Sequence, residues 1–87
     1  MFFLGQIEEA YRHNDTAKYY YQRAIAFSEA IKDYEAGYYI FSLLKLGRLY
    51  QKEGNKRKAR FYYEKVKKRT KRKHSAHEMA REYLKEL

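Results

Sequence analysis

Small, apolar and aromatic residues recur along the chain at one spacing of 42 residues. Each copy has a Leu-Gly pair, an Ala twelve residues after the Gly, a Tyr four residues later and a small apolar residue three after that. The matching residues are Leu4-Gly5 and Leu46-Gly47, Ala17 and Ala59, Tyr21 and Tyr63, and Ala24 and Val66. Because repetition at a period of about 20–50 residues is typical of repeat architectures, we predict a tandem repeat of one structural unit.

The hydrophobic pattern between these residues predicts helices. Apolar residues recur three and four apart, which is helical periodicity, and the sequence has no Pro to interrupt a helix. Asn14, Asp15 or Thr16 suits a helix N-cap, Gly54-Asn55 suits a turn with positive φ, and Ser75 with Glu78 has the spacing of a capping box. We expect helices at about residues 2–12, 14–32, from a break at Asp33 or Tyr34 to 52, 56–69 and 76–87, the last with an apolar stripe of Met79, Tyr83 and Leu87.

The pattern Leu43-x2-Leu46-Gly47-x2-Tyr50, followed by Ala59-x3-Tyr63-x2-Val66, resembles the signature of the tetratricopeptide repeat (TPR) family. In that family the small residues let the two helices of a hairpin cross closely, and the aromatic residues fill the space between repeats. The resemblance implies an all-α, right-handed alpha-alpha superhelix of two TPR-like hairpins, residues 1–33 and 34–73, with a C-terminal capping helix, residues 74–87. The period of 42 rather than about 34 residues marks a long-period variant. Leu43 stands where the family prefers Trp, and the closing Pro is missing.

The resemblance also implies a partner groove, lined by the first helix of each hairpin. By match to the family's positions, its residues are Gln6, Glu9, Phe41, Leu44, Arg48 and Gln51. Such a groove holds a peptide or helix of a partner, with Arg48 offering its charge to a carboxylate. In the alternative interpretation, Phe41 and Leu44 pack beneath a neighbouring helix and Arg48 is a solvated charge. The groove interpretation predicts a protein–protein interaction module, part of a larger scaffold or regulator.

A second signal is the position of the positive charge. The net charge is +9, yet residues 1–55 hold seven basic and seven acidic side chains, so the excess lies in residues 56–73. The basic residues there are Lys56, Arg57, Lys58, Arg60, Lys65, Lys67, Lys68, Arg69, Lys71, Arg72 and Lys73. This basic patch suits nucleic acid, an acidic protein surface or anionic lipid, but it is also typical of a solvated helix end. Phe61 and Tyr62 can stack on bases, although Phe61 and Tyr63 are more simply interpreted as core. Polyanion or nucleic-acid binding is therefore the alternative function.

Other classes of function lack support in the sequence. The chain has no Cys, and His74 and His77 do not have the spacing of a zinc-protease motif. Neither a nucleophile elbow nor a Gly-rich phosphate loop is present, so we expect no enzyme activity, no cofactor and no metal site. The sequence has no apolar run of membrane-spanning length and no secretory signal, which predicts an intracellular, cytoplasmic location.

The N-terminal end carries apolar side chains that are expected to need a cover, namely Phe2, Phe3 and Leu4. Two repeats are few for a stacked array, in which each repeat is stabilised by its neighbours. We therefore expect either that the chain is a fragment of a longer array or that it self-associates through its N-terminal end.

Overall fold

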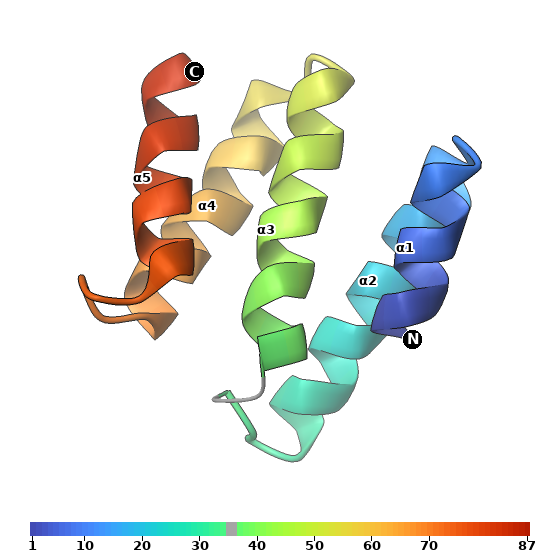
Figure 1. Cartoon of the computed structure of the whole chain (residues 1–87), viewed down its shortest axis with the longest axis horizontal. Coiled ribbons are helices and arrows are strands. Elements are labelled where there is room, and N and C mark those ends of the chain that lie inside the picture. The colour runs from blue at the N-terminus through green and yellow to red at the C-terminus, as the bar shows by residue number, and fades with distance from the viewer. Residues whose placement is uncertain (35–36) are drawn as a thin grey trace.

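Five helices joined by short turns form the part of the chain that the structure describes, residues 1–34 and 37–87 of a computed structural model (Figure 1). They are α1 (Phe2–Ala10), α2 (Asn14–Ala30), α3 (Gly37–Lys52), α4 (Lys56–Arg69) and α5 (Ser75–Glu86). The expectation of an all-α fold is confirmed. The expected start of the second hairpin, at residue 34, runs into residues 35–36, which lie outside the described residues. Over the described ranges, no helix combines the length and the apolar character needed to cross a membrane.

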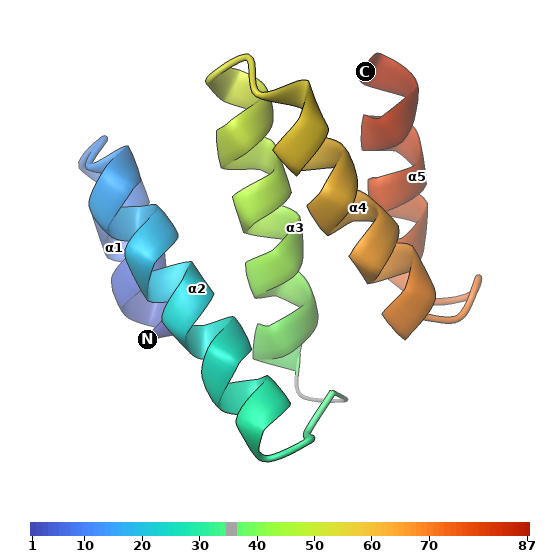
Figure 2. The ribbon, with the colours of Figure 1, turned by 180° about the vertical axis from the view of Figure 1, so that it is seen from behind.

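The helices pack as two pairs with a fifth helix at one edge. α1 packs on α2 and α3 on α4, while α2 contacts α3 and α4 contacts α5. Figure 1 shows α1, α3 and α5 on the near side, and Figure 2 shows α2 and α4 nearer when the molecule is seen from behind. The molecule measures 32 × 31 × 18 Å, and the shortest dimension corresponds to two layers of helices, each about 10 Å thick. The odd-numbered helices therefore form one face of the molecule and the even-numbered helices the other.

The first three helices are followed by the same kind of turn. The second residue after each helix has positive φ, with values of 64° at Arg12, 55° at Lys32 and 81° at Gly54. At each of these turns, backbone amides bond back to carbonyls of the last helical turn, which is the pattern of a Schellman motif. The positive φ expected at Gly54 is confirmed, and Arg12 holds the matching position of the first hairpin.

The N-caps of two helices differ from the expected ones. α2 begins at Asn14 with His13 as its N-cap, and α5 begins at Ser75 with His74 as its N-cap. The Nδ1 atom of His74 accepts a hydrogen bond from the backbone amide of Ala76 at 3.1 Å. The capping box at Ser75 is therefore wrong, because the imidazole acceptor one residue earlier satisfies an orphan amide of the first turn.

The sequence repeat is also a repeat in packing, carried by a glycine and a tyrosine in each hairpin. A Cβ atom added to Gly5 would lie 2.6 Å from Cε1 of Tyr21, and one added to Gly47 would lie 2.4 Å from Cε1 of Tyr63. Both tyrosines are fully buried, at 0% exposure. Each glycine thus lets the first helix of its hairpin rest on the ring of the second, whereas the resemblance implied that the aromatic residues lie between repeats.

Each of these rings is also held by the same hydrogen bond. The hydroxyl of Tyr21 donates to Oε1 of Glu9 at 2.8 Å, and that of Tyr63 donates to Oε1 of Gln51 at 2.6 Å. Glu9 and Gln51 are themselves 42 residues apart. Burial raises the pKa of Tyr63 to about 12, because the phenolate is disfavoured away from water.

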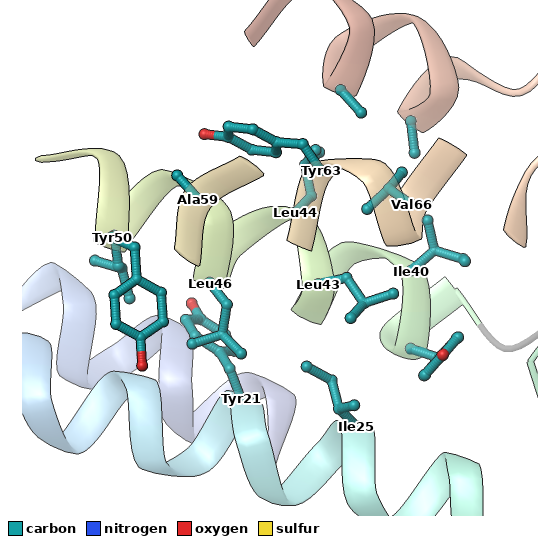
Figure 3. Close-up of a cluster of buried hydrophobic side chains, with 14 of the residues drawn as sticks. Tyr21, Ile25, Ile40, Leu43, Leu44, Leu46, Tyr50, Ala59, Tyr63 and Val66 are labelled. Carbon is teal, nitrogen blue, oxygen red and sulfur yellow. The ribbon is translucent and has the colours of Figure 1, made fainter. Parts of the chain in front are cut away.

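The core lies between α2, α3 and α4. Figure 3 shows Leu43 and Leu46 of α3 pointing toward Tyr21 and Ile25 of α2. The Tyr50 hydroxyl, one turn further along α3, accepts a hydrogen bond from a side chain of α2 at 3.3 Å. The second hairpin is therefore seated on the first through one face of α3.

The last helix contributes small side chains to the core. Ala76 and Ala80 are fully buried, and the Tyr83 ring lies with its centre 5.4 Å from that of Tyr63. Met79, which was expected on the apolar stripe, is 38% exposed. That part of the prediction is wrong, because the two alanines bring α5 close to α4 and turn Met79 away from it.

Candidate functional site

The expected groove of the second hairpin is occupied by α5. A guanidinium nitrogen of Arg48 lies 3.5 Å from Oε1 of Glu86, and the guanidinium carbon is 4.2 Å from the centre of the Tyr83 ring. The amide nitrogen of Gln51 donates to the same Glu86 carboxylate at 3.4 Å. Arg48 and Gln51, which were expected to contact a partner, therefore contact the chain's own last helix.

Two apolar residues expected in that groove pack against the core. Leu44 is 4% exposed, so its assignment to an open groove is wrong, and the alternative of packing beneath a neighbouring helix describes it. Phe41 is half-buried and packs against the same core. Neither Leu44 nor Phe41 is therefore fully accessible to a partner peptide.

On the first hairpin, the remaining two groove residues line a small hollow. Gln6 and Glu9 of α1 face Lys45 of α3 across a space of about 290 Å³. Glu9 already accepts the hydrogen bond of Tyr21. The hollow is open and of mixed polarity, so it offers a shallow contact rather than an enclosed site.

A more spacious hollow than the one beside Gln6 and Glu9 lies on the outer face of α4. It has a volume of about 970 Å³ and is lined by Arg57, Arg60, Phe61, Glu64, Lys65, Lys68 and Arg69. We call these seven residues the α4 face. They lie opposite the residues that bury α4, which are Ala59, Tyr63 and Val66. The structure thus gathers five of the eleven predicted basic residues around a single apolar side chain.

That apolar side chain is Phe61, which is 58% exposed. The interpretation of Phe61 as a core residue is wrong, because it is two positions from both Ala59 and Tyr63, about 200° around the helix from each. Its ring contacts that of Tyr62 edge to face, with 5.1 Å between centres. The position of Phe61 relative to Ala59 and Tyr63 could therefore have predicted its exposure from the sequence.

The cations at one end of the α4 face are tied to the rest of the fold. Lys65 Nζ lies 2.6 Å from Oε2 of Glu29, which also accepts a hydrogen bond from Tyr39 at 3.1 Å. The hydrogen bond from Lys65 lowers the pKa of the Glu29 carboxyl. The guanidinium of Arg69 stacks 4.0 Å from the centre of the Tyr34 ring. These contacts fix Lys65 and Arg69 in place, while Glu64 is the single carboxylate among the lining residues.

The other predicted basic residues point to different surfaces. Lys58 lies over the Tyr50 ring at 5.1 Å, whereas Lys67 and Arg72 line a second, polar hollow together with residues of α5. Lys71 and Lys73 line a third hollow after the end of α4, and Lys56 is exposed in its first turn. The basic patch of the sequence is therefore divided in space among several surfaces, and the hollow that holds Lys71 and Lys73 also contains Tyr34 and Ile40.

The histidines serve local structure. His77 Nδ1 lies 3.0 Å from the Thr70 hydroxyl, and His74 caps α5. Among residues 1–34 and 37–87, no three His, Asp or Glu side chains gather in a way that could hold a metal ion.

Comparison with known proteins adds no relative. No protein-family model matches the chain, and neither a curated protein nor a solved structure matches it. The surfaces of the molecule are therefore the basis on which a function is inferred.

Proposed function

We propose that the chain is a TPR-like protein-interaction module that binds an acidic segment of a partner protein on the α4 face. The observation that carries this proposal is the exposed Phe61 at the centre of five basic side chains. An apolar centre surrounded by charge is the usual anatomy of a protein-binding surface, in which the aromatic residue anchors and the rim selects.

The TPR-like part of the proposal is supported by the repeated packing of the two hairpins. Gly5 rests on Tyr21 as Gly47 rests on Tyr63, and α3 packs on α2 as α5 packs on α4. A superhelix follows if each hairpin adds to the last with the same rotation, and the right-handed sense is what the resemblance to TPR implies. In this proposal the helical repeats act as a scaffold that holds the α4 face rigid.

The proposed partner has a defined chemistry. An amphipathic helix with one large apolar residue and several Glu or Asp side chains would cover Phe61 and face Arg57, Arg60 and Lys68. Fully burying a Phe side chain is worth roughly 1.5–3 kcal/mol, and Phe61, which is 58% exposed, would gain about half of that. Each exposed ion pair adds about 0.2–1 kcal/mol. The apolar contact and the three cations therefore contribute comparable shares of the affinity, and the charges also give orientation, partner choice and salt dependence.

Nucleic acid is the second candidate, favoured by Lys71, Arg72 and Lys73, which extend the positive surface beyond the end of α4. The two candidates make different demands. Phosphate backbones would use every accessible cation, including these three, and would depend weakly on one phenyl ring. An acidic helix would depend on Phe61 and would be indifferent to the distant cations.

The test is fluorescence anisotropy with two labelled probes, an acidic peptide carrying Leu and Glu at helical spacing and a single-stranded oligonucleotide. Phe61→Gln and the double variant Arg57→Gln/Arg60→Gln are each compared with Lys71→Gln/Lys73→Gln, which removes the same charge elsewhere. We expect the peptide to bind the wild type and to lose about tenfold in affinity with either α4-face variant, since 1.4 kcal/mol corresponds to tenfold. The Lys71/Lys73 variant should retain binding.

The opposite pattern would contradict the proposal. If the oligonucleotide binds more tightly than the peptide, and Lys71→Gln/Lys73→Gln weakens it as much as Arg57→Gln/Arg60→Gln does, the basic segment is a polyanion site. Circular dichroism of each variant controls for folding, and Phe61→Gln is expected to leave it unchanged because the ring is mostly in solvent.

A further inference from the structure

The outward side of α1 carries a stripe of apolar side chains. Phe3 is 58% exposed, Leu4 47%, Ile7 51% and Tyr11 73%. Their spacing places them on one side of the helix, opposite Gly5, which packs on α2. We call these four residues the α1 stripe. α1 is thus apolar on the side that faces away from its own hairpin, and at the start of the helix the Phe3 ring also contacts that of Tyr38 of α3, with 5.2 Å between centres.

The internal repeat shows what kind of surface this is. Leu4 and Ile7 correspond, at the spacing of 42 residues, to Leu46 and Leu49 of α3. Those two residues are 0% and 1% exposed, and Figure 3 shows Leu46 directed toward α2. Because the glycine-tyrosine contact sets the same rotation for both first helices, Leu4 and Ile7 occupy the face that α3 buries against α2. The counterparts of Phe3 and Tyr11 are Lys45, which is half-buried, and Glu53, which is exposed, so these two residues lie at the margin of that face. In this fold, the corresponding side of a first helix packs against another helix.

The opposite end of the molecule is built differently. The outward residues of α5 are mostly polar and exposed, among them Glu78, Arg81, Glu82 and Lys85. Stacking the α1 stripe of one molecule on the α5 end of another would bury these charges without apolar gain. Head-to-tail association is therefore disfavoured, and the α1 stripe itself is the better complement for a second α1 stripe.

Charge leads to the same arrangement. Residues 1–55 are electrically balanced, with seven basic and seven acidic side chains, and the positive excess lies in residues 56–73. Figure 1 places α1 at one side of the molecule and α4 with α5 at the other. Two copies that meet through α1 keep their basic segments far apart. The nearest charged side chain, Glu8, is engaged within its own chain by His13 at 2.7 Å.

We propose that a second copy of this chain covers the α1 stripe, giving a two-fold symmetric dimer through α1. The same patch is then used by both copies, as an isologous contact requires. In this dimer both α4 faces remain open and point outward, so one assembly presents two binding surfaces for an acidic partner. Linked surfaces of this kind raise the apparent affinity for a partner that carries two such segments.

The test is sedimentation velocity of the whole chain over a dilution series, with variants of matched exposure. Leu4→Gln/Ile7→Gln removes apolar surface from the α1 stripe, and Phe61→Gln, the control, removes an exposed ring from the α4 face. We expect a dimer for the wild type and for Phe61→Gln, and a monomer for Leu4→Gln/Ile7→Gln. Leu4 and Ile7 are about half exposed, at 47% and 51%, and Gln can keep its amide in water at both positions, so circular dichroism should show an intact fold for both variants.

A wild type that stays monomeric at every concentration would overturn this proposal. So would a dimer that persists in Leu4→Gln/Ile7→Gln, or one that dissociates with Phe61→Gln and so uses the α4 face. This test of the dimer is separate from the test of the proposed function. Fluorescence anisotropy of the acidic peptide with Leu4→Gln/Ile7→Gln measures binding to the α4 face when the α1 contact is absent.

Discussion

The contact between Gly47 and the Tyr63 ring makes the sharpest test of how the hairpin is held. A Cβ atom at Gly47 would lie 2.4 Å from Cε1 and 2.7 Å from Cδ1 of Tyr63. Carbon atoms pack at about 3.5–4.0 Å, so the ring would have to retreat by about 1 Å. Tyr63 is fully buried and its hydroxyl is held by Gln51, so it has no open space to enter. Gly47→Ala is therefore expected to destabilise the protein.

The magnitude follows from three contributions. Overpacking of a buried position costs about 1–3 kcal/mol, and displacing the hydroxyl from Gln51 costs about another 1 kcal/mol as a lost hydrogen bond. Against this, Ala is favoured over Gly within a helix by about 1 kcal/mol. The net loss in the free energy of unfolding is about 1–3 kcal/mol, which for a chain of this size lowers Tm by roughly 5–15 °C.

The assay is urea and thermal denaturation followed by far-UV circular dichroism, in two backgrounds. In the wild type, Gly47→Ala should lower both midpoints. In a Tyr63→Leu background the ring is gone, so the same substitution should be neutral or stabilising, because only the helix propensity of Ala remains. Equal effects in the two backgrounds would refute the reasoning, since the cost would then not come from the ring.

Three further predictions concern the turns, the core and the response to pH. Arg12→Gly should raise the free energy of unfolding by about 1 kcal/mol, because Arg12 has φ 64° where the second hairpin has Gly54, and a loss in urea denaturation would contradict this. Ser42→Ala should be neutral or stabilising by up to about 1 kcal/mol, because no described residue hydrogen-bonds to its buried Oγ, and a lower urea midpoint would mean that the hydroxyl has a partner. Burial raises the pKa of Tyr39 and of Tyr63 to about 12 from 10.0, so their contribution to stability is complete below pH 10 and is lost as pH rises from 10 toward 12. In an alkaline titration the last part of the Tyr absorbance change, which comes from the buried rings, should accompany the loss of circular dichroism. Complete ionisation of all eleven tyrosines before unfolding would contradict the burial argument.

The sequence by itself determined the helices and the register of the repeat. Both depend on local spacing: Gly47 and Tyr63 are sixteen residues apart, as are Gly5 and Tyr21, and a glycine can accept a ring wherever two helices cross. The positive φ at Gly54 was equally readable, because it belongs to a short turn with a known residue preference.

Only the tertiary structure decided which surfaces are open. Leu44 and Arg48 were assigned to a groove, yet α5 packs over that side of α3 and binds Arg48 through Glu86. The position of α5 depends on Ala76 and Ala80, which are fully buried. Their burial depends on the helix that they contact and cannot be read from the apolar pattern of α5 itself. Spacing along one helix does not say how close the next helix can come.

The same reason explains Phe61 and Leu4. Phe61 lies on the side of α4 that no other helix of the described residues covers, so an apolar residue ends in solvent beside five cations. Leu4 and Leu46 match in type and in register, yet one is 47% exposed and the other is fully buried. A sequence determines which faces of a helix are apolar, but burial requires a neighbour, and only the three-dimensional arrangement shows where one is present.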